Sequence, residues 1–245
     1  MWNYLILVCS SLALSNAASL PASIQKCQND DKLNDCIMEN SKEAIAGLLK
    51  GIPSLGIPVL DPLKIEKIEQ TTSGSRSVSM NFSLSDVELK GLKDAELVKS
   101  EFDTANKIIQ FSIKIPQLVI TSHYNLNGKF LVVPVTGSGK LMLTIDELDF
   151  TYSMNYNIEE KDGVEYVMPN FPGKLTYASK KVTPVFENLF NGDQDLGENF
   201  NKMVNENWQE WDAQVGPGIA DALAQVIGTL LKRVTDAVPY KEMFL

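Results

Sequence analysis

The chain has 245 residues, a formal net charge of -9 and a hydrophobic content of 44%. This length fits one large all-β or α+β domain, or two small ones. The acidity argues against nucleic acid as a partner and against tight docking on anionic lipid, because both favour clustered Lys and Arg.

The N-terminus has the pattern of a secretory signal peptide. An apolar core is followed by small residues through Ser15, Asn16 and Ala17, although Lys and Arg are missing ahead of the core. We expect a signal peptide at residues 1–17 and one secreted domain at residues 18–245. A retained anchor is the alternative, which the short core disfavours, and no later segment approaches the roughly twenty apolar residues of a membrane span. Stable membrane insertion is therefore not expected.

Cleavage would leave Cys27 and Cys36 as the remaining cysteines. Two cysteines in a chain bound for an oxidising compartment predict a disulfide, which would tie the N-terminal arm to the first helix. Zinc binding is the alternative, and two thiols without a nearby histidine make a poor zinc site.

An amphipathic helix is predicted from Asp35 to Lys50, with Gly51 as its stop signal. The segment that follows, Gly51–Pro62, is apolar and contains three prolines. Because proline lacks a backbone donor and pushes the preceding residue toward extended geometry, this segment is expected to be an extended strip rather than a helix. Its Leu and Ile side chains need an apolar cover.

Alternation of apolar and polar residues with a period of two predicts a series of half-buried strands. It occurs over Val78–Leu84, Ile109–Ile115 and Leu118–Leu126, and most clearly over Leu148–Ile158, where every even position is apolar or aromatic. Strands that follow one another without intervening helices predict a long antiparallel sheet.

Three glycine-containing segments are typical of turns. Asn127-Gly128 and Asp162-Gly163 are hairpin signals, and Gly137-Ser138-Gly139 is interpreted as a hairpin turn or bulge. The last segment, with Lys140, departs from a phosphate-binding loop, because neither the required earlier glycine nor the following Ser or Thr is present.

Beyond Pro184 the period becomes helical. Phe186, Leu189 and Phe190 suit a short helix, and a longer helix is expected from about Asp195 to Ala237, after a break at Gly192-Asp193 and with a kink at Gly216-Pro217-Gly218. Its apolar stripe consists of Leu196, Phe200, Met203, Val204, Trp208, Trp211, Val215, Ile219, Leu223, Val226, Ile227, Leu230 and Val234. A sheet and a helix that each have one apolar face can hide those faces in each other, so we expect an α+β fold with a highly curved antiparallel sheet rolled around the C-terminal helix.

Residues for catalysis or metal binding are sparse. The single histidine, His123, falls on the polar side of its strand, and no Gly-x-Ser-x-Gly motif occurs, which disfavours a lipid-ester hydrolase. We expect no catalytic residue, no metal and no cofactor. The acidic residues along the last helix are interpreted as its solvated face: Asp193, Asp195, Glu198, Glu206, Glu210 and Asp212.

Asn81-Phe82-Ser83 is a glycosylation sequon in a predicted strand. Met80 and Phe82 point to one face and Asn81 to the other, so Asn81 is expected to face water. Glycosylation of Asn81 and an unmodified polar residue both stay open.

The apolar interior is the remaining candidate site. Aromatic and Met side chains line small-molecule cavities, and Tyr152 or Tyr156 could donate a hydrogen bond to a ligand oxygen, although ordinary core packing is the alternative for each residue. The candidate ligand-binding residues are Leu118, Ile120, Tyr124, Phe150, Tyr152, Met154, Tyr156, Phe200, Met203, Val204, Trp208, Trp211, Leu223, Val226 and Ile227.

Taken together, several blocks resemble the insect takeout and juvenile hormone-binding protein family. They are the pair Cys27 and Cys36, the proline-containing strip up to Leu63, the Gly-Ser-Gly-Lys-Leu segment at Gly137, and the C-terminal block Leu189–Phe244. The resemblance implies a long helix wrapped by a curved antiparallel sheet, related to the tubular lipid-binding superfamily, with a tunnel for a terpenoid hormone or another lipid. Haemolymph juvenile hormone carriers have a second cysteine pair in the C-terminal half, whereas this chain has no cysteine after Cys36 and is more similar to the takeout branch, whose ligands are diverse.

We therefore expect a secreted, extracellular, non-catalytic and monomeric carrier of a small hydrophobic ligand such as juvenile hormone or another lipid. The alternative is a secreted interaction or signalling protein with a merely structural cavity, whose surface engages a protein receptor.

Overall fold

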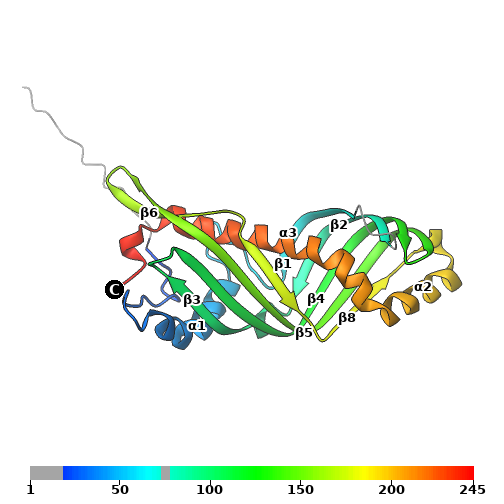
Figure 1. The fold of residues 1–245 in the computed structure, drawn as a ribbon, viewed down its shortest axis with the longest axis horizontal. Helices are drawn as coiled ribbons and strands as arrows, with labels where there is room; N and C mark the ends of the chain where they lie inside the picture. The colour runs from blue at the N-terminus through cyan, green and yellow to red at the C-terminus, as the bar shows by residue number, and fades with distance from the viewer. Residues whose placement is uncertain (1–18, 73–77) are drawn as a thin grey trace, which may run out of the picture.

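A curled antiparallel sheet of eight strands runs along a long C-terminal helix in the computed structural model of the protein, which describes residues 19–72 and 78–245 (Figure 1). The predicted signal peptide at residues 1–17 lies outside the described residues. The α+β class and the wrapping of the sheet around the C-terminal helix are confirmed.

The sheet is built on its two longest strands, β4 and β5, which pair along almost their whole length. In the order β1-β2-β4-β5-β6 each strand pairs with its neighbours, while β3 pairs with β4 and both β7 and β8 pair with β5. The strands are β1 (Leu63–Thr72), β2 (Val78–Lys90), β3 (Glu96–Asp103), β4 (Ile108–Phe130), β5 (Val133–Lys161), β6 (Val164–Pro169), β7 (Lys174–Ala178) and β8 (Lys181–Phe186).

Three α-helices accompany the described strands, and the longest of them, α3, lies against the concave side of the sheet (Figure 1). The helix α2 extends to one end of the molecule, and α1 lies at the opposite end, close to the C-terminus. The helical elements are α1 (Leu33–Leu49), η1 (Pro53–Leu55), η2 (Leu92–Asp94), η3 (Phe190–Gly192), α2 (Gln194–Glu206), α3 (Trp208–Ala237) and η4 (Tyr240–Glu242). The first helix begins two residues earlier than Asp35, where the sequence predicted its start.

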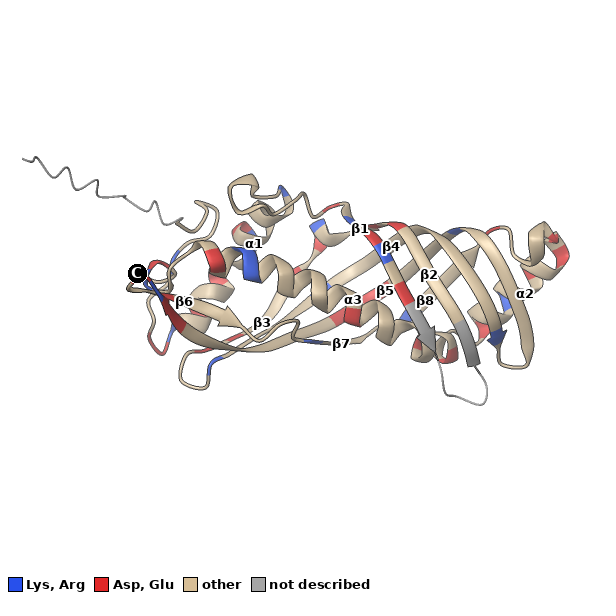
Figure 2. Ribbon diagram, turned by 90° about the horizontal axis from the view of Figure 1, so that it is seen from above, with Lys and Arg blue, Asp and Glu red and all other residues tan. Residues whose placement is uncertain are grey.

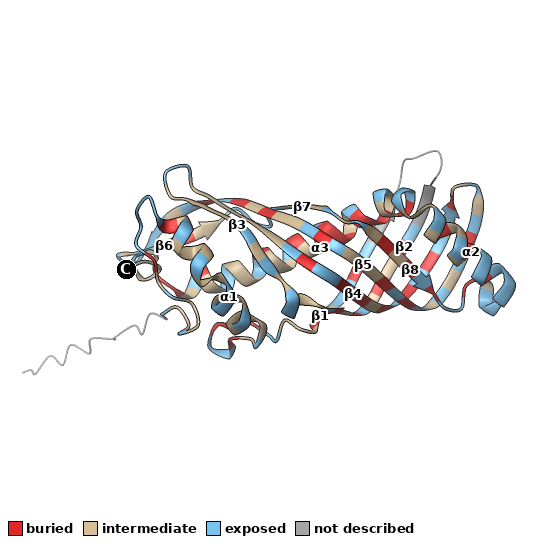
Figure 3. Cartoon of the chain, turned by 90° about the horizontal axis from the view of Figure 1, so that it is seen from below, coloured by how far each residue is buried: buried red, intermediate tan, exposed pale blue. Residues whose placement is uncertain are grey.

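The predicted alternation appears as bands of buried and exposed residues along β4 and β5 (Figure 3). In β4 the apolar positions are odd up to Ile115 and even from Leu118 onward. The register of β4 with β5 explains this change, because it passes from Ile115 paired with Leu148 to Gln117 paired with Asp146 and skips Pro116 and Glu147. A proline is tolerated in a strand at such an irregularity, where no ladder donor is needed.

The extended interpretation of Gly51–Pro62 is wrong in its first half. Ile52 and Ile57 exchange backbone hydrogen bonds of 2.8 and 3.0 Å, and η1 closes the turn between them. Proline is favourable at the first position of a helical turn, and Gly56 supplies the positive φ of 66° that ends it. The turn buries Ile52, Leu55 and Ile57 against Leu230 and Val234 of α3, which supply the expected apolar cover.

Two of the three turn predictions are wrong. Asn127 and Gly128 lie inside β4, and the chain turns instead at Leu131 and Val132, with Leu131 at a φ of 54°. The longer pairing buries Phe130 completely, which outweighs the local turn preference. Asp162-Gly163 does form the β5–β6 turn, as predicted.

The segment Gly137–Gly139 continues β5 and is not a turn. Glu187 and Asn188 cross closely over this part of the strand, and a Cβ atom at Gly139 would overlap the Glu187 carbonyl oxygen. These glycines are therefore required by the close approach of another chain segment.

Three details of the C-terminal region also differ from the prediction. Phe186 ends β8, and the helical turn η3 begins only at Phe190, because the even positions up to Phe186 continue the sheet alternation. The long helix is interrupted at Asn207, whose Nδ2 donates to the Met203 carbonyl oxygen at 2.8 Å, and α3 continues through Gly216-Pro217-Gly218, where a kink stays a prediction. Leu196 is 51% exposed in the first turn of α2, outside the buried stripe. The predicted break at Gly192-Asp193 is present, with Asp193 accepting from the Leu196 N–H at 3.0 Å.

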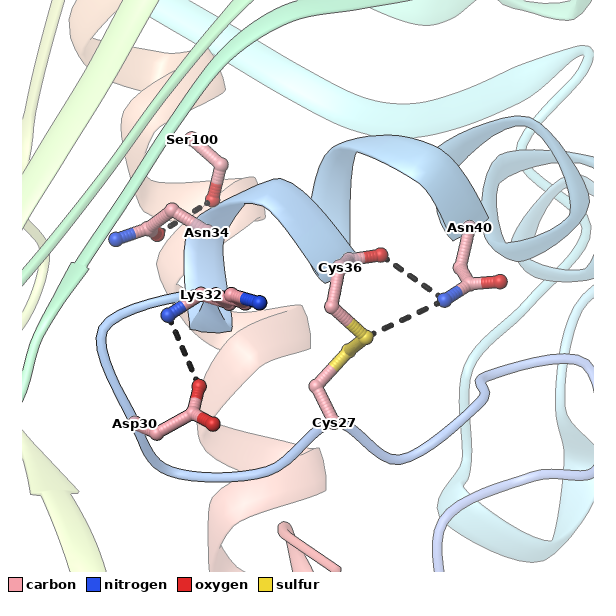
Figure 4. Close-up of a disulfide and its surroundings, with 7 residues drawn as sticks. All are labelled: Cys27, Asp30, Lys32, Asn34, Cys36, Asn40 and Ser100. Carbon is pink, nitrogen blue, oxygen red and sulfur yellow. Dashed lines mark hydrogen bonds between the residues drawn. A yellow bond between two sulfur atoms is a disulfide. The ribbon is translucent and has the colours of Figure 1, made fainter.

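Cys27 and Cys36 form the predicted disulfide, which joins the N-terminal arm to α1 (Figure 4). Asn34 of α1 accepts hydrogen bonds from the Phe102 N–H at 2.7 Å and from the Ser100 hydroxyl at 3.2 Å, so α1 is also held to β3. The arm and the C-terminus are joined by a 2.9 Å hydrogen bond from the Leu245 N–H to the Cys27 carbonyl oxygen. α1 is thereby fixed over one end of the sheet.

Candidate ligand-binding cavity

An elongated cavity of about 290 Å³ lies between α3 and the sheet. Small-molecule pockets range from about 300 to 1,000 Å³, so this volume is at the lower end for a ligand site. On α3 the lining residues run from Asp212 to Val234, which corresponds to about 33 Å at 1.5 Å per residue. The cavity is therefore long and narrow.

The sheet, the N-terminal region and the connection between β2 and β3, through Leu92 and Ala95, wall the cavity in addition to α3. The sheet supplies inward-facing residues of β1, β2, β4, β5 and β7, which side-chain alternation along the strands places on this face. The N-terminal region covers one end through Ile45, Leu48 and Leu49 of α1 and through Ile57 and Leu60 of the proline-containing segment. A local turn that buries apolar residues thus becomes part of the cavity wall.

Six of the fifteen predicted ligand-binding residues line the cavity. They are Leu118, Ile120, Phe150, Leu223, Val226 and Ile227. The other nine are placed elsewhere: Tyr124, Phe200, Met203, Val204, Trp208 and Trp211 pack toward α2, and Tyr152, Met154 and Tyr156 follow Phe150 along β5. Ligand contact by any of them stays a prediction.

The residues toward α2 form a packed aromatic cluster centred on Phe186. Its ring centroid lies 5.0 Å from that of Tyr124, 6.3 Å from Trp211 and 6.5 Å from Phe200, all in edge-to-face arrangements. The Tyr124 hydroxyl donates to the Glu187 carbonyl oxygen at 2.7 Å, and burial raises its pKa to about 12. This aromatic cluster bounds the cavity at its α2 end.

The two tyrosines predicted as ligand anchors are buried outside the cavity. The Tyr152 hydroxyl donates to the Pro172 carbonyl oxygen, and the Tyr156 hydroxyl has no hydrogen-bond partner among the described residues. Burial raises the pKa of each hydroxyl to about 12. Both side chains sit on the inner face of β5 as the alternation predicted, yet neither belongs to the cavity lining.

One polar pair belongs to the cavity wall. The Tyr177 hydroxyl, from β7, donates to Asp212 Oδ1, from α3, at 3.1 Å. Burial raises the pKa of the Asp212 carboxyl, partly offset by the hydrogen bond from Tyr177, and burial together with the negative charge of Asp212 raises the pKa of Tyr177. The other lining side chains are aliphatic or aromatic hydrocarbons, apart from Gly216.

The assignment of Asp212 to the solvated face of the helix is wrong. Asp212 is half-buried, whereas the other five acidic residues of that set are exposed. It shares a helical face with Gly216, Ile219 and Leu223, at spacings of four, seven and eleven residues, and this spacing was the signal that could have identified it.

The outer surface carries the charge. Asp and Glu positions are spread along the length of the ribbon, with Lys and Arg positions among them (Figure 2). His123 is exposed, as predicted from its strand position, and Asn81 is exposed beside buried Phe82, while its glycosylation stays a prediction. Within the described parts of the chain, no three His, Cys, Asp or Glu side chains gather in a way that could hold a metal ion. None of the helices formed by residues 19–72 and 78–245 is long and apolar enough to cross a membrane.

Comparisons with known proteins agree over almost the whole chain. The family described as Haemolymph juvenile hormone binding protein (JHBP) matches residues 4–245. Circadian clock-controlled protein daywake from Drosophila melanogaster is 23% identical over 244 residues, covering 96% of this chain and 92% of that protein. The protein of the same name from Drosophila yakuba is 24% identical over 234 residues, covering 91% and 88%. The crystal structure of Takeout 1 from Epiphyas postvittana matches with a TM-score of 0.78 and 25% identity, covering 90% of this chain and 99% of that one.

Proposed function

The chain belongs to the haemolymph juvenile hormone binding protein family, and on that premise we propose that it is a secreted, non-catalytic carrier of a small hydrophobic ligand. The ligand is a terpenoid hormone such as juvenile hormone, or another lipid, held in the cavity beside α3. The signal-peptide pattern, the disulfide and a family named for haemolymph proteins support secretion.

The observation that carries the proposal is the composition of the cavity wall. Of its side chains, the Tyr177 hydroxyl and the Asp212 carboxyl supply the polar groups, and the rest are hydrocarbon. Burying about 400 Å² of apolar ligand surface would gain roughly 10 kcal/mol before the cost of immobilisation, which leaves room for micromolar to nanomolar affinity. Because the wall is almost entirely hydrocarbon, the cavity disfavours water and favours the binding of an apolar ligand.

The test begins with the protein purified from its own tissue, whose bound lipid is extracted and identified by mass spectrometry. In parallel, the recombinant protein is titrated with the fluorescent probe N-phenyl-1-naphthylamine, which juvenile hormone or another terpenoid should displace. Ala220 lines the cavity and Ala213 is exposed on the same helix, so Ala220→Leu should weaken probe binding severalfold and Ala213→Leu should not.

Two results would contradict the proposal that the protein carries a ligand in this cavity. Absence of co-purifying lipid together with absence of saturable probe binding would favour action through the protein surface. Equal probe affinity in Ala220→Leu and the native protein would place binding outside this cavity.

A further inference from the structure

We propose that the ligand bears a hydroxyl group at one end of an apolar chain, and that this hydroxyl donates a hydrogen bond to the carboxyl group of Asp212. The inference rests on the proposed function and adds the chemical class of the ligand, a long-chain alcohol. It also fixes the direction of the ligand, because Asp212 is the lining residue of α3 nearest to α2 and the aromatic cluster.

The carboxyl group of Asp212 lacks partners for most of its acceptor sites. Among the described residues, the carboxyl group of Asp212 accepts a hydrogen bond from the Tyr177 hydroxyl and forms no ion pair with a Lys or Arg. A carboxylate can accept about four hydrogen bonds, and leaving such a group in an apolar wall is costly. A purely hydrocarbon ligand would displace any water from it and supply nothing in return, whereas a ligand hydroxyl would satisfy one further acceptor site.

The pairing of β7 with β5 and a glycine on α3 hold the Tyr177–Asp212 pair in the cavity wall. Tyr177 comes from β7, where its backbone pairs with Phe150 of β5, another lining residue. Gly216, one turn after Asp212 on α3, makes room for the pair, because a Cβ atom there would overlap the Tyr177 hydroxyl. Tyr177 is thus a positioning residue that orients the carboxyl group, and Asp212 is the residue that meets the ligand.

The remaining wall indicates what the rest of the ligand is. From Ile219 to Val234 the lining of α3 is entirely hydrocarbon, and so is the part contributed by α1. A chain without further polar groups fits this section, since any other donor or acceptor would be buried without a partner.

Other end groups of the ligand would interact less favourably with the carboxyl group of Asp212. A fatty acid would bring a second carboxylate against the first in a site of low dielectric constant. Esters and ethers, including the ester and epoxide groups of juvenile hormone, have no donor, so among the ligands of the proposed function the inference selects a lipid alcohol over juvenile hormone itself. An ammonium group would have to lose a much stronger hydration shell on entry than a hydroxyl does.

The test measures displacement of N-phenyl-1-naphthylamine by four ligands with the same chain: dodecanol, dodecyl methyl ether, dodecanoic acid and dodecylamine. Dodecanol should bind the native protein about tenfold more tightly than the ether, as expected for one hydrogen bond to a charged acceptor. Asp212→Leu should abolish this preference, and Tyr177→Phe should reduce it. Asp221→Leu, at an exposed carboxylate on the same helix, is the matched control and should preserve it.

Asp212→Asn separates hydrogen bonding from charge and serves if Asp212→Leu does not fold. Its amide oxygen still accepts, so the preference for dodecanol over the ether should persist, while dodecanoic acid should bind severalfold better than to the native protein. Equal affinity of the native protein for dodecanol and the ether would overturn the inference, and so would tighter binding of dodecylamine than of dodecanol. Failure of all four ligands to displace the probe would instead overturn the proposed function itself.

Discussion

At the scale of single residues, three tyrosines of the interior differ in what their hydroxyl groups contact. Tyr152 donates to the Pro172 carbonyl oxygen, Tyr177 donates to Asp212, and Tyr156 has no partner among the described residues. All three come from inward positions of strands, so sequence alternation treats them alike. Their contacts depend on which segment lies opposite, a loop in one case and α3 in another.

These contacts predict opposite outcomes for two substitutions of the same kind. Tyr152→Phe removes the donor that bonds to the Pro172 carbonyl oxygen, which should lower the free energy of unfolding by about 0.5 to 1.5 kcal/mol. Tyr156→Phe removes a buried hydroxyl without a partner and should leave stability unchanged or raise it. Urea denaturation of the two variants beside the native protein measures both values, and equal destabilisation would contradict the difference in bonding.

The residues that line the cavity show how much of the site could be predicted from the sequence. Leu118, Ile120, Phe150, Leu223, Val226 and Ile227 were predicted and line the cavity, because period alone places them on inner faces. Period could not distinguish an inner residue beside the cavity from one packed in the aromatic cluster, such as Phe200 or Trp211. Asp212 was missed because a carboxylate on a helix is usually assigned to the solvated face. Comparison with the apolar residues on the same helical face would have identified it.

At the scale of elements, local signals predicted strands and helices better than turns. The alternation that defines β4 and β5 repeats over many residues, so one unfavourable position does not change it. A turn signal consists of two residues, and at Asn127-Gly128 the burial of Phe130 and the pairing beyond it outweighed that signal. The glycines at 137 and 139 respond to a segment distant in the sequence, Glu187 and Asn188, which no local pattern reveals.

The N-terminal cover is the element most open to testing. α1 contributes Ile45, Leu48 and Leu49 to the cavity, and its attachments are the disulfide, the Asn34 hydrogen bonds to β3, and a 3.0 Å bond from the Leu60 N–H to the Leu49 carbonyl oxygen. Loss of the disulfide therefore loosens one wall of the cavity without touching the sheet.

A variant with Cys27→Ser and Cys36→Ser together should lose about 2 to 3 kcal/mol of stability, by the chain-entropy estimate for closing a loop of this length. Amide hydrogen exchange should become faster in α1, and the release rate of a bound fluorescent probe should increase severalfold. Exchange in α2, at the other end of the molecule, is the internal control. Unchanged exchange in α1 would mean that the remaining contacts suffice to hold the cover.

At the scale of the whole molecule, the sheet encloses two different interiors along one helix. Between Asp212 and Val234 the interior contains the cavity, and toward α2 it is filled by the aromatic cluster. The C-terminus lies at the α1 end (Figure 1), where the Leu245 N–H bonds to the Cys27 carbonyl oxygen. The length available to a ligand is therefore set by the N-terminal cover on one side and by aromatic packing on the other.

Trp211 immediately precedes Asp212 and contacts Phe186 at the centre of the aromatic cluster, so its size should limit the length of the ligand chain. Trp211→Leu should cost about 3 kcal/mol of stability, in the range for truncating a buried aromatic residue, and should extend the cavity toward α2. Competition with saturated alcohols of increasing length should then show a shift of the tightest-binding chain to a longer member of the series.

Trp208→Leu is the matched control, because Trp208 is only partly buried, lies beneath the Lys181 ammonium at 5.6 Å and does not line the cavity. An identical chain-length preference in Trp211→Leu and the native protein would show that the aromatic cluster does not define the end of the site.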